Sequence, residues 1–184
     1  MAQQGLNPAA QAVAWRGSLH SGSEFFANPQ TRYLETAGLC LQPGRLLVIR
    51  GKAAVFPNTY VGGSVFQPAF DGQIQLRYWS MCNNYQTIPN PVVACRADFE
   101  TSLDRNQFYT YVVSDNETAP SWLPGAVTWL PWGATSFPKS LMFRNILPLQ
   151  FTVEGDYIPR GVFCDQVLFK NRGWEGCFAA ALAH

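Results

Sequence analysis

The chain has 184 residues, enough for one domain with a sizeable core. Its hydrophobic fraction of 47% and its mean hydropathy of −0.06 are typical of a folded globular protein and exclude a disordered or membrane-embedded chain. The formal net charge of +1 gives no electrostatic basis for binding nucleic acid, so we expect no nucleic-acid partner.

Aromatic residues make up 14% of the chain, and charged residues also 14%, well below the roughly 25% of an ordinary globular protein. An aromatic-rich, weakly charged surface predicts that some apolar area is covered by a ligand or by another copy of the chain. The alternative is that a β-rich core simply uses Tyr, Trp and Phe. We expect self-association, as a dimer or higher, through a strand edge or the segment Trp122–Trp132. No apolar run approaches the ~20 residues of a membrane span.

Residues 1–32 are expected to form an N-terminal arm. Within it, Asn7 and Pro8 could cap a short helix over Ala9–Trp15, since Asn is a good N-cap and Pro suits a first helical turn. The body of the domain should span residues 33–178, and residues 179–184 should form a C-terminal tail.

The clearest buried strand is Arg45–Lys52, which follows the turn Gln42–Gly44. Further short segments rich in aromatic and β-branched residues are bounded by Asn, Asp, Pro and Gly, as strands are. They are Gln73–Ser80, Ala97–Leu103, Gln107–Ser114 and Lys139–Leu147.

Two regions differ from this strand pattern. The segment Pro120–Pro138 contains four prolines, which exclude a central strand and leave at most a short β piece at Ala126–Trp129. The segment Cys164–Lys170 has helical apolar spacing that ends near Gly173. The sequence therefore predicts an all-β protein, an antiparallel β-sandwich of jelly-roll type with short peripheral helices.

Five cysteines are many for a reducing compartment. Cys82 and Cys95 flank one loop of an expected hairpin, and Cys164 and Cys177 bracket the expected helix, so each pair is a candidate disulfide. Cys40 then stays single. Sequence alone leaves open the pairing of Cys40 with Cys164 or Cys177.

The cysteines and the N-terminal residues also bear on metal binding and location. No Cys-x-x-Cys pair occurs, and His20 and His184 lie near opposite ends, so we expect no metal and no cofactor. No export leader is readable after Met1. Because the cysteine content favours an oxidising compartment, we expect a secreted or periplasmic protein that begins at its mature N-terminus.

Several sequence blocks resemble those of uncharacterised, usually exported, bacterial proteins. They cover roughly Tyr33 to Trp174 and are, in order, Arg50–Ala53, Phe56–Thr59, Leu76–Cys82, Trp129–Gly133, Phe143–Pro148 and Gly155–Cys164. More distantly, the chain is similar to a β-sandwich domain of unknown function that accompanies a second such domain in larger bacterial proteins. The resemblance implies fold and export but no reaction, and the missing leader departs from it.

The sequence lacks the motifs of nucleotide, serine-hydrolase and metalloprotease sites. A Ser-His-Asp site would have to recruit His20 or His184. Acidic pairs drawn from Asp98, Glu100, Glu154 and Asp156 could converge for carboxylate chemistry, although any fold of this size offers such pairs by chance. No catalytic residue is therefore assigned.

The cations placed inside apolar strands are more informative. Arg50, Lys52, Arg77 and Arg144 must each be paired, stacked on an aromatic ring or placed at a sheet rim. In the structural interpretation they pair with Asp98, Glu100 or Asp156. In the functional one they bind a small anionic or carbonyl-bearing ligand. The expected ligand site comprises Arg50, Lys52, Arg77, Tyr78, Trp79 and Arg144, with Tyr157 and Arg160 on a loop over one end.

Two classes of function follow. The first is a small-molecule-binding or self-assembling structural module, favoured by the aromatic content and the absence of a catalytic motif. The second is a hydrolase or isomerase that uses a carboxylate with Arg or Tyr in a sandwich pocket. A carboxylate with a perturbed pKa in the deepest pocket would favour the enzyme.

Overall fold

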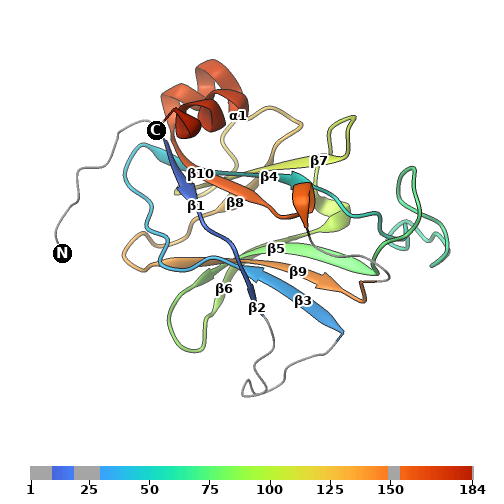
Figure 1. Ribbon diagram of the computed structural model, residues 1–184. Helices are drawn as coiled ribbons and strands as arrows, with labels where there is room; N and C mark the ends of the chain where they lie inside the picture. The colour runs from blue at the N-terminus through green and yellow to red at the C-terminus, as the bar shows by residue number, and fades with distance from the viewer. Residues whose placement is uncertain (1–9, 19–29, 149–153, 184) are drawn as a thin grey trace.

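The computed structural model describes residues 10–18, 30–148 and 154–183, and consists of two five-stranded sheets that face each other in a sandwich-like arrangement (Figure 1). Sheet A has the order β1 (Ala10–Val13), β10 (Arg160–Asp165), β4 (Arg45–Lys52), β7 (Phe108–Ser114) and β8 (Thr128–Pro131). Sheet B has the order β2 (Arg16–Ser18), β3 (Thr31–Glu35), β9 (Lys139–Ile146), β5 (Tyr78–Tyr85) and β6 (Val92–Ala97). Neighbouring strands are antiparallel except β7 and β8, which are parallel, so sheet A is mixed.

The main core lies between the two sheets. Trp79 of β5 is fully buried there, with its ring centroid 5.4 Å from that of Tyr109 and 5.8 Å from that of Phe143. Leu47 and Ile49 of β4 face the same core and have no exposed surface. Alternate residues of one strand point to opposite faces, so Leu46 and Val48 face outward from sheet A.

A smaller core covers that outer face of sheet A. The helix α1 (Gln166–Leu182) packs there through Phe169 and Cys177, against Val48 and Val162 of the sheet. The Asp165 carboxylate starts the helix by accepting hydrogen bonds from the backbone N–H groups of Val167 and Leu168.

The helix α1 is interrupted at Gly173, which has a φ of 64° and a ψ of −166°. This backbone conformation favours glycine. It turns the second half of α1 relative to the first, as the two coils at the top of Figure 1 show. Within the described residues, no helix combines the length and the apolar character that crossing a bilayer requires.

Both predicted disulfides are confirmed. Cys82 bonds to Cys95, its register partner across β5 and β6, and Cys164 of β10 bonds to Cys177 of α1. Cys40 is free, as expected, and exposed. Two disulfides indicate an oxidising, extracytoplasmic compartment.

Three strands match their predicted segments closely, namely β4, β7 and β9. The first half of Gln73–Ser80 is not a strand, since β5 begins at Tyr78 and runs on to Tyr85. Ala97–Leu103 is not a strand either. The Asp98 carboxylate accepts hydrogen bonds from the N–H groups of Trp79 and Phe99, and the chain turns into the 3-10 helix η1 (Asp98–Glu100).

The predicted helix over Ala9–Trp15 is wrong, because Ala10–Val13 is strand β1. A seven-residue helix is only marginally stable alone, whereas this segment gains backbone hydrogen bonds along the edge of β10. Strands β1 and β2 both fall within the range expected for an arm, and they form one edge of each sheet. A single α-helix, α1, is present in the described ranges in place of the short peripheral helices expected, and η1 and η2 (Gly155–Tyr157) are 3-10 turns.

Candidate ligand-binding cavity

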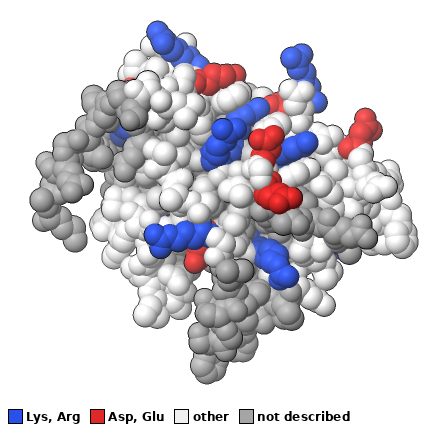
Figure 2. Space-filling view, viewed as in Figure 1, with Lys and Arg blue, Asp and Glu red and all other residues white. Residues whose placement is uncertain are grey.

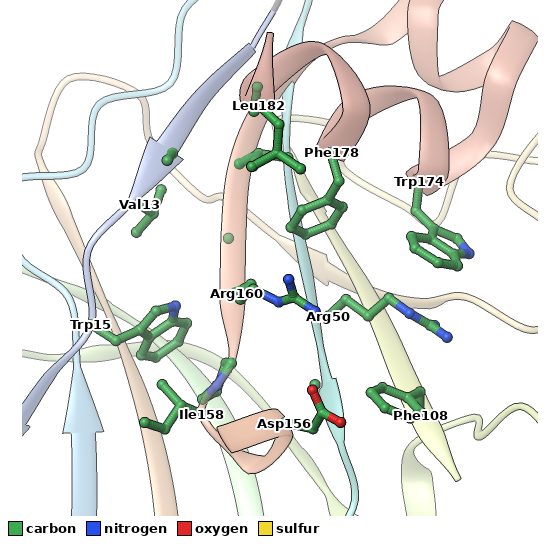
Figure 3. A pocket seen from close by; sticks show the side chains of 16 residues that line it. Val13, Trp15, Arg50, Phe108, Asp156, Ile158, Arg160, Trp174, Phe178 and Leu182 are labelled. Carbon is green, nitrogen blue, oxygen red and sulfur yellow. The ribbon is translucent and has the colours of Figure 1, made fainter. Parts of the chain in front are cut away.

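A cavity of about 710 Å³ lies on the outer face of sheet A, where the second half of α1 overhangs the strands (Figure 3). Its floor is formed by β4 and β10, its roof by α1, and its rim by β1 and the segment around η2. A volume of this size suits a drug-sized small molecule.

The walls of the cavity are mainly apolar and aromatic. The side chains that line them come from four separate parts of the chain, and they are Val13, Trp15, Phe108, Ile158, Trp174, Phe178 and Leu182. Trp174 and Phe178 are four residues apart on α1, so both rings point down from one face of the helix, as Figure 3 shows.

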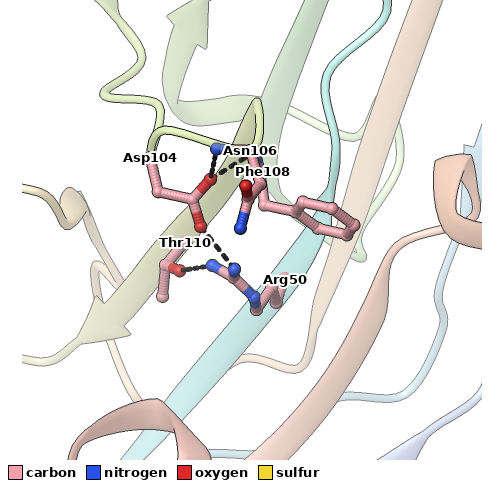
Figure 4. A network of polar contacts seen from close by, with 5 residues as sticks. All are labelled: Arg50, Asp104, Asn106, Phe108 and Thr110. Carbon is pink, nitrogen blue, oxygen red and sulfur yellow. Dashed lines mark hydrogen bonds and ion pairs between the residues drawn. The ribbon is translucent and has the colours of Figure 1, made fainter.

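Arg50 is held firmly at the floor of the cavity (Figure 4). Its guanidinium forms an ion pair with Asp104 and donates a 2.8 Å hydrogen bond to the hydroxyl of Thr110. The same group lies over two rings, 3.9 Å from the centroid of Trp174 and 4.9 Å from that of Phe108. These contacts give Arg50 a structural role.

Asp104 is in turn fixed by the turn in which it lies. Burial pushes the pKa of this carboxyl upward, but the hydrogen bonds from Arg50 and from the backbone N–H groups of Phe108 and Asn106 outweigh burial. The Asp104 pKa therefore lies below its usual value, and the carboxylate stays charged beside Arg50.

Arg160 is the register partner of Arg50 on β10 but lies in a different environment. Its side chain is exposed, and its guanidinium forms no hydrogen bond or ion pair within the described part of the chain. Figure 3 places this group in the middle of the cavity, between Phe178 and Asp156. Trp15 also lines the cavity, and its indole N–H is buried without an acceptor among the described residues.

The other predicted ligand residues do not all meet at this cavity. Lys52 lies on the same face of β4 as Arg50, with its ammonium 5.5 Å from the ring centroid of Tyr157, just beyond the cavity rim. Tyr157 lines a neighbouring open groove that runs along residues 71–75. Arg50 and Arg160 thus line the cavity, with Lys52 and Tyr157 beside it.

The remaining four predicted residues belong to sheet B or its border. Trp79 lies wholly in the core and can touch no ligand. Arg144 of β9 lies 5.5 Å from the ring centroid of Tyr33. Arg77 and Tyr78 line a separate pocket of about 240 Å³. The expected single site is therefore divided between two faces of the molecule.

This second pocket contains the most perturbed carboxyl among the described residues. Asp98 is 4% exposed, and desolvation by burial raises its pKa to about 6, despite hydrogen bonds from the backbone N–H groups of Trp79 and Phe99 and the charge of Arg77. Its other walls include Tyr60 and Phe99, whose rings stack with centroids 3.7 Å apart. No group of three or more His, Cys, Asp or Glu side chains among the described residues could hold a metal ion.

The sequence interpretation missed the aromatic walls of the larger cavity. Trp15, Phe108, Trp174 and Phe178 come from distant parts of the chain, so no local motif joins them. The four-residue spacing of Trp174 and Phe178 was a usable signal, because it places both rings on one helical face.

Neither a protein-family model nor a curated protein sequence matches the chain. Among solved structures, the fold is similar to that of an uncharacterised protein from Burkholderia cenocepacia, with a TM-score of 0.58 and 12% identity, over 85% of this chain and 35% of that one. A protein from Vibrio parahaemolyticus matches with a TM-score of 0.46 and 17% identity, over 73% of this chain and 30% of that one.

The present chain thus spans about a third of the length of these two solved proteins. The likeness to the Burkholderia protein concerns the fold alone. Its bacterial source and uncharacterised status agree with the resemblance noted from the sequence.

Proposed function

We propose that this domain is a non-enzymatic binding module that holds a small organic anion with an apolar body in the cavity beneath α1. The observation that carries the proposal is the placement of Arg160. A cation with no partner in the described part of the chain points into a cavity whose other walls are largely apolar and aromatic.

The cavity also supplies complementary chemistry for such a ligand. A carboxylate placed beside Arg160 would form charge-assisted hydrogen bonds, worth about 1.5–3 kcal/mol. The rings of Trp174 and Phe178 would cover the apolar body of the ligand at a small entropic cost, since both are already held by α1.

Calorimetric titration with simple probes tests the proposal. We expect octanoate and 1-naphthoate to bind, and the neutral analogues octanol and 1-naphthol to bind at least tenfold more weakly. Arg160→Ala should remove most of the preference for the anion. Arg105→Ala, which removes an exposed arginine that does not line the cavity, is the matched control and should leave binding unchanged. Equal affinity for acids and alcohols would contradict the proposal.

A second candidate function is a hydrolase or isomerase that uses Asp98 with Arg77 and Tyr78. The observation that favours it is a buried carboxyl with a pKa raised to about 6, in a pocket that also contains an arginine. An enzyme of this kind should cleave members of a panel of chromogenic esters or glycosides, with a pH–rate inflection near 6 that Asp98→Asn removes.

Asp98 also predicts a dependence of stability on pH. Its pKa is higher in the folded state than the ~3.9 of an unfolded chain, so between about pH 4 and 6 the folded state binds the proton more tightly. Stability should fall as pH rises through that window, by roughly 3 kcal/mol at most. Asp98→Asn should flatten the profile in urea titrations. A buried acid without a catalytic role would give the same stability profile, so activity on the chromogenic substrates is what identifies an enzyme.

We further infer a jelly-roll topology, export from the cell, and self-association. The strand order β1-β10-β4-β7 facing β3-β9-β5-β6 supports the first, and the two disulfides support the second. For self-association, exposed Val92 on the edge strand β6 supports contact between copies. Light scattering that gives a monomer at micromolar concentration would contradict it.

A further inference from the structure

The loop between β4 and β5 carries the largest cluster of exposed apolar side chains along the described chain. Tyr60, Val61, Val65 and Phe66 are 70%, 71%, 49% and 86% exposed. No charged residue occurs between Lys52 and Asp71. The loop projects from one end of the sandwich, at the right of Figure 1, and is drawn wholly in white in Figure 2.

Several backbone N–H groups of this loop donate within the loop itself, whereas those of Tyr60, Val61, Ser64 and Val65 have no partner among the described residues. The N–H of Asn58 donates to the carbonyl of Gln67 at 2.8 Å, and that of Gly63 donates to the carbonyl of Asn58 at 3.0 Å. At the base, the N–H of Ala69 donates to the carbonyl of Phe56 at 2.9 Å. These bonds close the base and middle of the loop, and the remaining N–H groups at the tip can keep water at a bilayer interface, where insertion is shallow.

The loop is also held in one position. The Tyr60 ring stacks on Phe99 of η1, and Arg77 donates a 3.2 Å hydrogen bond to the hydroxyl of Thr59. A Cβ added at Gly63 would lie 2.4 Å from the carbonyl oxygen of Asn58, so the tight closure requires glycine there. The apolar tip is therefore displayed on a fixed base.

From its tip to its base, the loop changes from apolar to polar side chains, which is the order from the acyl region of a bilayer to its headgroups. Val61, Val65 and Phe66 lie at the tip, while Tyr60 and the exposed cation Arg77 lie at the base. Apolar side chains favour the acyl region, whereas tyrosine and arginine favour the headgroup level. The tip offers no charged side chain for an ion pair across a protein interface, and the hydroxyl of its polar residue Ser64 already accepts a hydrogen bond from the N–H of Phe66.

We propose that the loop 57–68 is a membrane-surface contact that inserts its apolar tip into the outer layer of a phospholipid bilayer. The insertion is interfacial and does not span the membrane. It involves none of the residues that line the cavity beneath α1, so it stands apart from the proposed ligand site.

Vesicle co-sedimentation tests this proposal. The wild-type chain should bind phosphatidylcholine vesicles, with an affinity that is insensitive to added salt because the tip is uncharged. The double variant Tyr60→Ser/Phe66→Ser should lose at least tenfold in partitioning. Ile88→Ser/Val167→Ser is the matched control, because it removes two exposed apolar side chains, 99% and 64% exposed, from the β5–β6 hairpin and the start of α1.

Three outcomes would overturn the proposal: no binding by the wild-type chain, equal loss in the control, or binding only to phosphatidylglycerol vesicles that salt abolishes. The proposal is also overturned if the wild-type chain does not bind vesicles and instead forms a dimer in sedimentation velocity that the Tyr60/Phe66 variant does not form. In that case a second copy of the chain covers the loop. A near-wild-type melting temperature would establish that the variants fold. A dye attached at Phe66→Cys in a Cys40→Ser background should shift to the blue on vesicles.

Discussion

The two faces of sheet A are built from the same strands and differ in how completely they are covered. On the inner face, Leu47 and Ile49 of β4 have no exposed surface because sheet B covers the whole strand. On the outer face, α1 covers Leu46 and Val48, and at Arg50 its Trp174 ring lies over the guanidinium at the start of the cavity. Because α1 is too short to cover the whole outer face of the sheet, a cavity lined by side chains remains beside it, and such a cavity can bind a ligand.

The pair Arg50 and Arg160 shows what this partial cover means for individual side chains. The two residues face each other across β4 and β10. Arg50 is neutralised by Asp104 and enclosed by Trp174 and Phe108, whereas Arg160 is exposed in the cavity. Arg50 therefore contributes to stability, whereas Arg160, at the adjacent position on the same face, is proposed to bind the ligand.

The largest effect is expected from removing the disulfide that holds the cavity roof. Cys164→Ala/Cys177→Ala opens a bridge between residues 13 apart and should lower the free energy of unfolding by about 3 kcal/mol. It should also expose α1 to hydrogen exchange, because the bridge joins the second half of the helix to β10. Urea titration and exchange mass spectrometry measure the two effects.

Cys82→Ala/Cys95→Ala is the matched control, since these cysteines are also 13 residues apart but lie on strands that the ladder already pairs. We expect a similar loss of global stability without local exposure of α1. Equal exposure of α1 in both variants would mean that the roof is held by packing alone.

The next effect tests the closed inner face. A Cβ added at Gly51 would lie 2.4 Å from the hydroxyl oxygen and 2.7 Å from the ring of Tyr109, which is fully buried. Gly51→Ala should therefore destabilise the protein by about 2 kcal/mol, the usual range for overpacking a core. Gly125→Ala, where the added atom meets nothing within 4 Å, should change little. An unchanged urea midpoint for Gly51→Ala would show that the inner face tolerates expansion.

The sequence predicted the inner core better than the outer face. Apolar segments bounded by turn residues, such as Arg45–Lys52, indicate strands, so β4, β7 and β9 were predicted with nearly correct bounds. Cysteine spacing gave both disulfides. These features are local or depend on a few strongly patterned segments.

The site depends on contacts that are not local. Arg77 and Trp79 are two residues apart, a spacing that would put both on one face of a regular strand. Trp79 nevertheless lies in the core and Arg77 is exposed, because β5 begins only at Tyr78 and Arg77 precedes it. Likewise β1 became a strand only because β10 offered an unpaired edge. Arg50 is not available to bind a ligand anion, because it pairs with Asp104. The sequence could not predict this pair, since the two residues are 54 positions apart in the chain.

A smaller effect compares two buried tyrosines of β7. The hydroxyl of Tyr109 has no hydrogen-bond partner among the described residues, whereas that of Tyr111 lies 2.5 Å from the hydroxyl of Thr101. Tyr109→Phe should be neutral or stabilise the protein by up to about 1 kcal/mol, and Tyr111→Phe should destabilise it by about 1 kcal/mol. The melting temperatures of both variants measure these two changes in stability. A large loss for Tyr109→Phe would indicate that water or a ligand pairs with its hydroxyl.

The smallest effect on stability is expected for Arg160→Ala, and it most directly tests the difference between the two arginines. Arg160 is exposed and unpaired within the described chain, so its removal should change the free energy of unfolding by less than about 0.5 kcal/mol. Arg50→Ala leaves Asp104 without its partner and removes the group enclosed by two rings, so it should destabilise by about 1–3 kcal/mol. Urea titration of the two variants side by side measures the contrast. If Arg160→Ala is as destabilising as Arg50→Ala, Arg160 is a structural residue, and the cavity loses the cation on which its proposed ligand depends.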